Sequence, residues 1–221
     1  MKECIKVPKD PQPREPDELI EDGQRLKIGA LEVDPDRRLG PAGERRHEDR
    51  LVAEEPLEIR LASPARPAQR VWVTMRTPGH DFELAAGFAV HESLVTPSSI
   101  AQVAYCTDVD LSPEQAFNVV TLTVDRATDI PVRHGAVTGG SSACGVCGKD
   151  TIAEVLDGHR APAWSGPRPS PAVVRTLPDR LEEAQRVFAR TGGLHAAGHF
   201  TEDGELLVAR EDVGRHNAVD K

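Results

Sequence analysis

Apolar and polar residues alternate in several short stretches of the chain, each bounded by Pro, Ser or Asp. Alternation with a period of two is typical of a β-strand with one buried face, and the bounding residues favour turns. The pattern predicts four strands in the first part of the chain: Leu57–Leu61, Val71–Arg76, Ala101–Cys106 and Phe117–Val124.

The spacing of apolar residues becomes helical between the second and third of these strands. The apolar positions of this helix are Phe82, Ala85, Ala86, Ala89 and Val90. The turn residues Thr77-Pro78-Gly79 precede it, and Asp81 can cap its first turn. On this evidence alone, His80 and Asp81 are interpreted as turn and cap.

Two further helices are expected in the second half of the chain. A short one is predicted over Lys149–Leu156, followed by a Pro-rich connection through Pro171. A longer one is predicted over Asp179–Arg190, and Gly192-Gly193 supplies its stop.

The last part of the chain predicts a hairpin and the start of another helix. The strands Leu194–Phe200 and Glu205–Arg210 meet at Asp203-Gly204, a strong hairpin turn signal. The helix start follows at Gly214-Arg215-His216-Asn217, and the sequence ends at Lys221. Because a domain seldom stops one turn into a helix, we expect the full protein to continue and part of its site to be missing.

The first fifty residues differ from the rest, because about half are charged and Pro recurs with no apolar period. They predict a disordered arm, with folded structure beginning near Arg50.

The net charge of -9 disfavours nucleic acid as a partner, since phosphate binding draws its affinity from Lys and Arg. With no secretory signal at the start and no run long enough to span a bilayer, we expect a cytoplasmic protein without a membrane partner.

Candidate chemistry centres on Cys144 and Cys147. Four cysteines are too few for a disulfide scaffold, so this closely spaced pair indicates chemistry or metal binding. Glycines surround both thiols in the stretch Gly139–Lys149, so a sulfur donor or a bulky acceptor can approach them. If a helix begins near Lys149, its N-terminus favours the thiolate of Cys147, the form that attacks sulfur.

Three interpretations of the cysteine pair compete: half a zinc site, a redox dithiol and a sulfur carrier. A zinc site needs two more ligands, and His195 and His199 would lie about 13 Å apart in the extended segment predicted there, too far to share one ion. A redox dithiol usually lies near the start of its domain, whereas this pair lies far along the chain. Spacing alone does not choose among the three.

Several segments of the sequence resemble, in the same order, motifs of the FdhD family. They are EPLEIRL at Glu55–Leu61, MRTPGHDFELAAGF at Met75–Phe88, SSACGVCGK at Ser141–Lys149, TGGLHAAG at Thr191–Gly198 and EDVGRHNAVDK at Glu211–Lys221. The resemblance implies an α/β (α+β) fold, with a mixed sheet and flanking helices similar to cytidine deaminase, and a homodimer. On this basis the chain has an N-terminal subdomain at 50–110 and a core at 111–221 that is incomplete at its C-terminus, and the arm at 1–49 lies outside the resemblance.

The resemblance also implies a function, that of a sulfurtransferase. Cys144 matches the family's persulfide carrier, and Cys147 matches its supporting cysteine. Sulfur would come from a cysteine desulfurase and go to the molybdenum (or tungsten) bis-pterin guanine dinucleotide cofactor of the client, the catalytic subunit of formate dehydrogenase. A guanine nucleotide would mimic this acceptor, and no permanently bound metal is expected.

The remaining motifs are compatible with holding that cofactor. Backbone N–H groups at the predicted start of a helix, together with an arginine, can bind phosphate oxygens. The candidate cofactor-binding residues are Gly192, Gly193, His195, Arg215, His216 and Asn217. Each motif also has a plainer interpretation, with Asn217 as an N-cap, the glycines as a helix stop and His195 as a packed strand residue.

Two features of the sequence depart from the family pattern. Ser93 stands where the family usually has Gly, and family members continue for several tens of residues beyond the position of Lys221.

A zinc-binding, deaminase-like protein would need Pro before its Cys-x-x-Cys, but Ala143 precedes Cys144 here. A cofactor-binding chaperone would bind guanine nucleotide tightly without taking up sulfur.

Overall fold

A computed structural model describes residues 50–125, except 65, 108–110, 112–114 and 116, and residues 165–221. Before residue 50 it describes the backbone of five short strands: β1 (Asp17–Leu19), β2 (Leu26–Ile28), β3 (Leu31–Val33), β4 (Arg37–Gly40) and β5 (Gly43–Arg46). β1 pairs with β6 (Arg50–Val52), and β2–β3 and β4–β5 form two small hairpins. The predicted disorder of the 1–49 arm as a whole stays a prediction.

A four-stranded sheet forms the larger part of the described fold, in the order β8-β7-β10-β9. Its strands are β7 (Glu55–Ser63), β8 (Arg66–Arg76), β9 (Ile100–Tyr105) and β10 (Val119–Val124), so the four strands predicted from alternation are confirmed. β7 pairs antiparallel with β8 and parallel with β10, which makes the sheet mixed. A boundary at residue 110 would cut this sheet, because β10 lies beside β7; the subdomain division stays a prediction.

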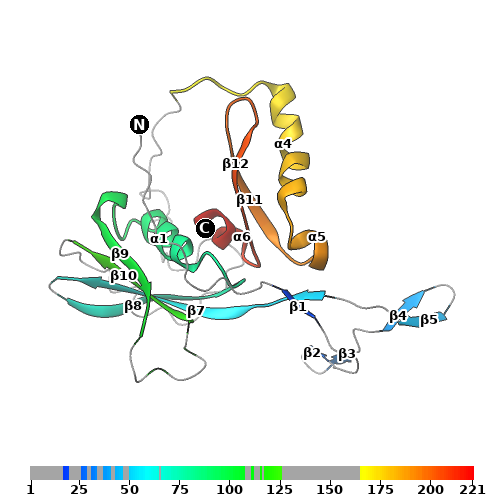
Figure 1. The fold of residues 1–221 in the computed structure, drawn as a ribbon, viewed down its shortest axis with the longest axis horizontal. Coiled ribbons are helices and arrows are strands. Elements are labelled where there is room, and N and C mark those ends of the chain that lie inside the picture. The colour runs from blue at the N-terminus through cyan, green and yellow to red at the C-terminus, as the bar shows by residue number, and fades with distance from the viewer. Residues whose placement is uncertain are drawn as a thin grey trace, which may run out of the picture.

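Helix α1 (Asp81–His91) covers one face of the sheet, as Figure 1 shows. The alternating residues Leu57, Ile59 and Leu61 of β7 are at most 2% exposed and belong to the same core as the apolar face of α1. Trp72 of β8 stacks on Phe88 of α1 with ring centroids 4.2 Å apart. Burying each large apolar side chain contributes roughly 1.5–3 kcal/mol, so this layer holds the fold together.

A second layer is built from α4 (Pro171–Ala184), α5 (Phe188–Thr191) and the hairpin β11 (His195–Phe200) and β12 (Leu206–Asp212). α4 runs alongside the hairpin (Figure 1). The hairpin is confirmed, with Gly204 in the left-handed region at φ 80° as the predicted turn requires.

The bounds predicted for the long helix, Asp179–Arg190, are wrong. α4 begins eight residues earlier at Pro171, because Ser170 caps it by accepting a 3.2 Å hydrogen bond from the Val173 N–H and Pro is favoured in the first turn. α4 ends at Ala184, and the short α5 follows as a separate helix.

Helix α6 (Arg215–Asp220) packs between α1 and the base of the hairpin. A Cβ atom on Gly87 of α1 would collide with the Asp220 carbonyl oxygen, so the absent side chain permits this close approach. The helix predicted over Lys149–Leu156 lies outside the described residues. Within the described part of the chain, no helix has the length and hydropathy needed to cross a membrane.

Candidate functional site

Two motifs that are far apart in the sequence meet at the base of the hairpin. The Thr77 N–H donates to Asp212 Oδ2 at 3.1 Å, across 135 positions of sequence, and the Val213 N–H donates to Thr77 Oγ1 at 3.1 Å. Asp212 is fully buried at the end of β12. These bonds fasten the turn before α1 to the turn before α6.

The last helix is held on the same aspartate. Lys221 Nζ lies 2.7 Å from Asp212 Oδ2 and donates to the Thr77 carbonyl at 2.8 Å. Asn217 Nδ2 donates to Asp212 Oδ1 and to the Met75 carbonyl, each at 2.9 Å. We name these four residues, Thr77, Asp212, Asn217 and Lys221, the aspartate lock.

The structure gives Asn217 a role that neither sequence interpretation, cofactor contact or N-cap, had assigned to it: its side chain donates to Asp212 and to the Met75 carbonyl. Its suggested role as N-cap is wrong, because Gly214 is the N-cap of α6 and Asn217 is the third residue of the helix, fully buried. The Gly214 N–H donates to Asp212 Oδ1 at 2.8 Å, so this amide and that of Val213 are already paired within the protein. Asn217 Oδ1 has no hydrogen-bond partner among the described residues.

A second buried polar cluster is centred on Arg76. It adjoins the aspartate lock because Arg76 directly precedes Thr77 in the chain. This fully buried arginine makes two bonds to Asp81, from Nη2 to Oδ2 at 2.8 Å and from Nε to Oδ1 at 3.1 Å. Nη2 also donates to Asn118 Oδ1 at 2.9 Å, and Tyr105 Oη donates to Asp81 Oδ2 at 3.1 Å. Burial by itself would lower the pKa of Arg76, but the bonds and charge of Asp81 outweigh it, and the pKa is raised.

Asp81 therefore does not cap α1 as predicted. It is the first residue of the helix and 1% exposed, with its carboxylate committed to Arg76. The N-cap is His80, which adopts the left-handed conformation and makes no side-chain cap bond. Sequence reasoning missed this ion pair because an aspartate before a helix is far more often a cap than a buried partner.

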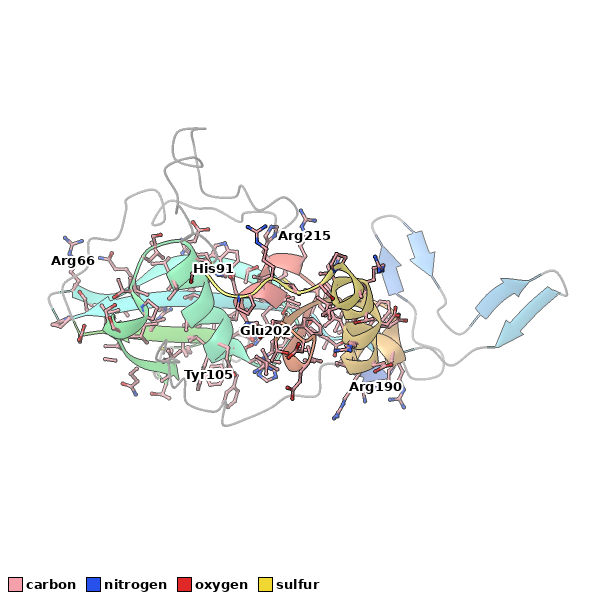
Figure 2. All side chains as sticks on the ribbon, turned by 90° about the horizontal axis from the view of Figure 1, so that it is seen from above. Arg66, His91, Tyr105, Arg190, Glu202 and Arg215 are labelled. Carbon is pink, nitrogen blue, oxygen red and sulfur yellow. The ribbon has the colours of Figure 1, made fainter. Side chains whose placement is uncertain are left out.

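The candidate cofactor-binding residues other than Asn217 gather at one end of the hairpin, because His195 pairs directly with Asp212. Gly192, Gly193 and His195 precede or begin β11, while Arg215 and His216 begin α6 just after β12. Figure 2 shows Arg215 projecting outward from α6. We call this group, Gly192, Gly193, His195, Arg215 and His216, the hairpin-base cluster.

The members of the hairpin-base cluster differ from the lock in exposure. Gly192, Gly193, His195 and Arg215 are exposed and His216 is half-buried, whereas Asp212 and Asn217 are buried. Gly192 is the C-cap of α5 at φ 69°, so its predicted role as a helix stop is confirmed. The structure thus places the exposed side chains of His195 and Arg215 beside the buried aspartate lock.

The two cysteines on which the sulfur chemistry depends, Cys144 and Cys147, lie outside the described residues. Cys106 is half-buried at the end of β9, with its Sγ 3.8 Å from Arg60 Nη1. His195 and His199 both lie on β11, an extended strand as predicted. Among the residues that the structure describes, no three His, Cys, Asp or Glu side chains are grouped as a metal site would require.

The fold and the aspartate lock define a mixed α/β protein in which two motifs far apart in the sequence are joined by hydrogen bonds to Asp212, Thr77 and Met75. The model of the FdhD/NarQ family matches residues 52–221. The chain belongs to this family.

Relatives with known names support the same assignment. The chain is 47% identical over 203 residues to the sulfur carrier protein FdhD of Streptomyces coelicolor, covering 89% of this chain and 65% of that protein. It is 44% identical over 186 residues to the protein of the same name from Nocardia farcinica, covering 83% and 64%. The chain therefore spans about 65% of the length of these relatives.

A solved structure shows the same fold. It is that of a protein from Desulfotalea psychrophila described as a formate dehydrogenase accessory protein. The TM-score is 0.61 at 20% identity, over 93% of this chain and 67% of the other. With the mixed sheet and its flanking helices, this confirms the predicted α/β class.

Proposed function

We propose that this chain is a sulfur carrier that takes up sulfur as a persulfide on Cys144, with Cys147 assisting. The donor is a cysteine desulfurase, and the acceptor is the molybdenum or tungsten bis-pterin guanine dinucleotide cofactor of formate dehydrogenase. The observation that carries this proposal is the 47% identity to a relative named as a sulfur carrier protein. We further propose that the protein acts in the cytoplasm as a homodimer.

The mechanism is a relay between sulfur nucleophiles. The thiolate of Cys144 attacks the terminal sulfur of the donor persulfide, and the donor cysteine leaves as its thiolate. The protein then presents the bound sulfur to the acceptor. A glycine follows each cysteine directly, Gly145 after Cys144 and Gly148 after Cys147, and their missing side chains favour the access that these two encounters need.

The hairpin-base cluster is the proposed contact for the dinucleotide part of the acceptor. Arg215 is exposed and suited to bind pyrophosphate oxygens, because a guanidinium presents a planar fork of donors. His195 and His216 can add hydrogen bonds, and Gly192 and Gly193 let the backbone approach a ligand. Asn217, in contrast, supports this surface from behind, because it is buried within the aspartate lock.

The proposal is tested by peptide mass spectrometry after incubation with a cysteine desulfurase and cysteine, without reductant. We expect a gain of about 32 Da, one sulfur atom, on the peptide that contains Cys144. Cys106→Ala should gain sulfur like the wild type, and Cys144→Ala should not. Uptake that persists in Cys144→Ala would overturn the persulfide assignment, and tight guanine nucleotide binding with no uptake would favour a cofactor-binding chaperone.

The proposed contact surface has a separate test. Arg215→Ala should weaken binding of a guanine nucleotide, measured by calorimetry, while sulfur uptake stays unchanged. Arg186→Ala is the matched control, because Arg186 is an exposed arginine that lies just after α4. Equal affinities of the two variants would remove Arg215 from the proposed site.

A further inference from the structure

Glu83 of α1 and Arg210 of β12 form a loose ion pair between the two layers of the fold. Arg210 Nη2 lies 3.8 Å from Glu83 Oε1, beyond hydrogen-bond distance, and the two side chains are 24% and 27% exposed. Arg210 Nη1 donates instead to the Ala209 carbonyl at 3.0 Å. The guanidinium and the carboxylate therefore attract each other without a direct hydrogen bond between these two atoms.

Each side chain of this pair also has an atom without a hydrogen-bond partner. Among the residues that the structure describes, three buried side-chain nitrogen or oxygen atoms lack a partner, and two of them are Glu83 Oε2 and Arg210 Nε. Such atoms are rare because leaving them unpaired is unfavourable, and they mark a place for water or a ligand. One small group that donates to the carboxylate and accepts from the guanidinium would satisfy both.

An exposed aromatic ring adjoins the pair. His80 Nδ1 lies 3.3 Å from Glu83 Oε1, and 52% of the imidazole side chain is exposed. The backbone of His80 is strained, with φ 58° and ψ 31° in the left-handed region, although the side chain does not cap α1. Strain of this kind is concentrated at binding and catalytic sites. A bound water would satisfy the donor and the acceptor but would gain nothing from the ring.

We propose that Glu83, Arg210 and His80 bind the edge of a planar heterocycle that carries an N–H beside a C=O, as the rings of guanine and pterin do. The ring N–H donates to Glu83 Oε2, the ring carbonyl accepts from Arg210 Nε, and the ring face packs on the imidazole of His80. The terminal torsion of a glutamate is soft, so a ligand at the surface can reach Oε2. The inference rests on the proposed function, whose acceptor contains both rings, and it assigns their recognition to residues outside the hairpin-base cluster.

The first test compares two nucleosides on the full chain by ligand-observed NMR titration. Guanosine has no phosphate, so its binding does not depend on a phosphate contact at Arg215. 1-Methylguanosine is the matched control, because a methyl group replaces the N–H at the proposed edge. We expect guanosine to bind about tenfold more tightly, because the methylated ring leaves the carboxylate unpaired. Equal affinities, or no binding of guanosine, would mean that the pair holds water only and would overturn the proposal.

Substitutions test the three residues separately. Arg210→Lys keeps the positive charge but removes Nε, and Glu83→Met removes the acceptor while keeping an unbranched side chain. Each should weaken guanosine binding about tenfold and abolish the preference over 1-methylguanosine. His80→Asn removes the ring but tolerates a left-handed backbone, so it should weaken the binding of both nucleosides alike.

The control variant is Glu182→Met, which removes an exposed glutamate of α4 and should bind guanosine like the wild type. Circular dichroism checks that each variant is folded. Full affinity and selectivity in both Arg210→Lys and Glu83→Met would remove this pair from the binding site. The failure of the sulfur-carrier proposal is recognised separately, by undiminished sulfur uptake in Cys144→Ala, because nucleoside binding requires no cysteine.

Discussion

Asp212 and Lys221 form an ion pair of 2.7 Å between Oδ2 and Nζ, with side chains that are 0% and 1% exposed. The pair closes a loop from the end of β12 to the residue after α6. Thr77, from the turn before α1, also donates to Asp212, so two distant motifs depend on one buried carboxylate. The outward-facing hairpin-base cluster owes its position to this support.

Removing the lysine should leave that carboxylate buried without its cation. We expect Lys221→Met to lower the free energy of unfolding by about 3–5 kcal/mol, because breaking a buried ion pair from one side leaves an uncompensated charge. Urea denaturation measures this loss. The control is Val219→Ala on the same helix, which removes a 62% exposed side chain and should change the stability by less than about 0.5 kcal/mol. Similar losses in the two variants would mean that α6 contributes through apolar contact alone.

Arg76 should not tolerate replacement by lysine. Its guanidinium binds Asp81 through two nitrogens and Asn118 through one of them, and an ammonium cannot reproduce this planar set of donors. We expect Arg76→Lys to cost about 1–3 kcal/mol of stability, measured by chemical denaturation. Arg66→Lys makes the same change at an exposed position on the same strand, and a comparable cost there would contradict the argument.

The strands and helix α1 could be predicted because burial of one face leaves a periodic trace in the sequence. β7 shows this directly: Leu57, Ile59 and Leu61 alternate with polar residues and all three are buried. The start of α4 was missed although its signal, Ser170 before Pro171, was present, because the apolar period is clear only from Leu181 onward. A cap and a proline were a better guide to that helix than hydrophobicity.

The contacts that build the site left no such trace. Charged residues are most often exposed, so nothing in the sequence distinguished Asp212 and Lys221 from surface charges. The bond from Thr77 to Asp212 spans 135 positions and has no periodicity to reveal it. The motif at Glu211–Lys221 made Asn217 a candidate residue, but only the fold shows that its side chain is buried against Asp212.

Gly87 should be required for the packing of α6 on α1. A Cβ atom there would overlap the Asp220 carbonyl, which belongs to the backbone and cannot move aside as a side chain would. We expect Gly87→Ala to destabilise the protein by about 1–3 kcal/mol in spite of its better helix propensity, as overpacking does. Gly193→Ala is the control, since its Cβ would lie 3.7 Å from Val52 Cγ1, an ordinary contact. A gain in stability from Gly87→Ala would show that α6 can shift without cost.

Asp220 and Glu83 should respond to pH in opposite directions. Burial raises the pKa of Asp220, and the hydrogen bond and charge of His91 offset this only in part. Its protonated form is thus favoured in the folded state, so its stabilising contribution is complete below the unfolded value of 3.8 and is lost as the pH rises through the folded value. Because asparagine stays neutral, the stability of Asp220→Asn relative to wild type should increase from pH 3 to pH 7.

The stability of Glu83→Gln should change in the opposite direction. Burial by itself would raise the pKa of Glu83, but the hydrogen bond to His80, together with the charges of His80 and Arg210, outweighs burial and lowers the pKa below 4.5. Glu83→Gln should therefore lose stability relative to wild type from pH 3 to pH 7. Denaturation at a series of pH values measures both differences, and a falling curve for Asp220→Asn would mean that the ion pair with His91 outweighs burial.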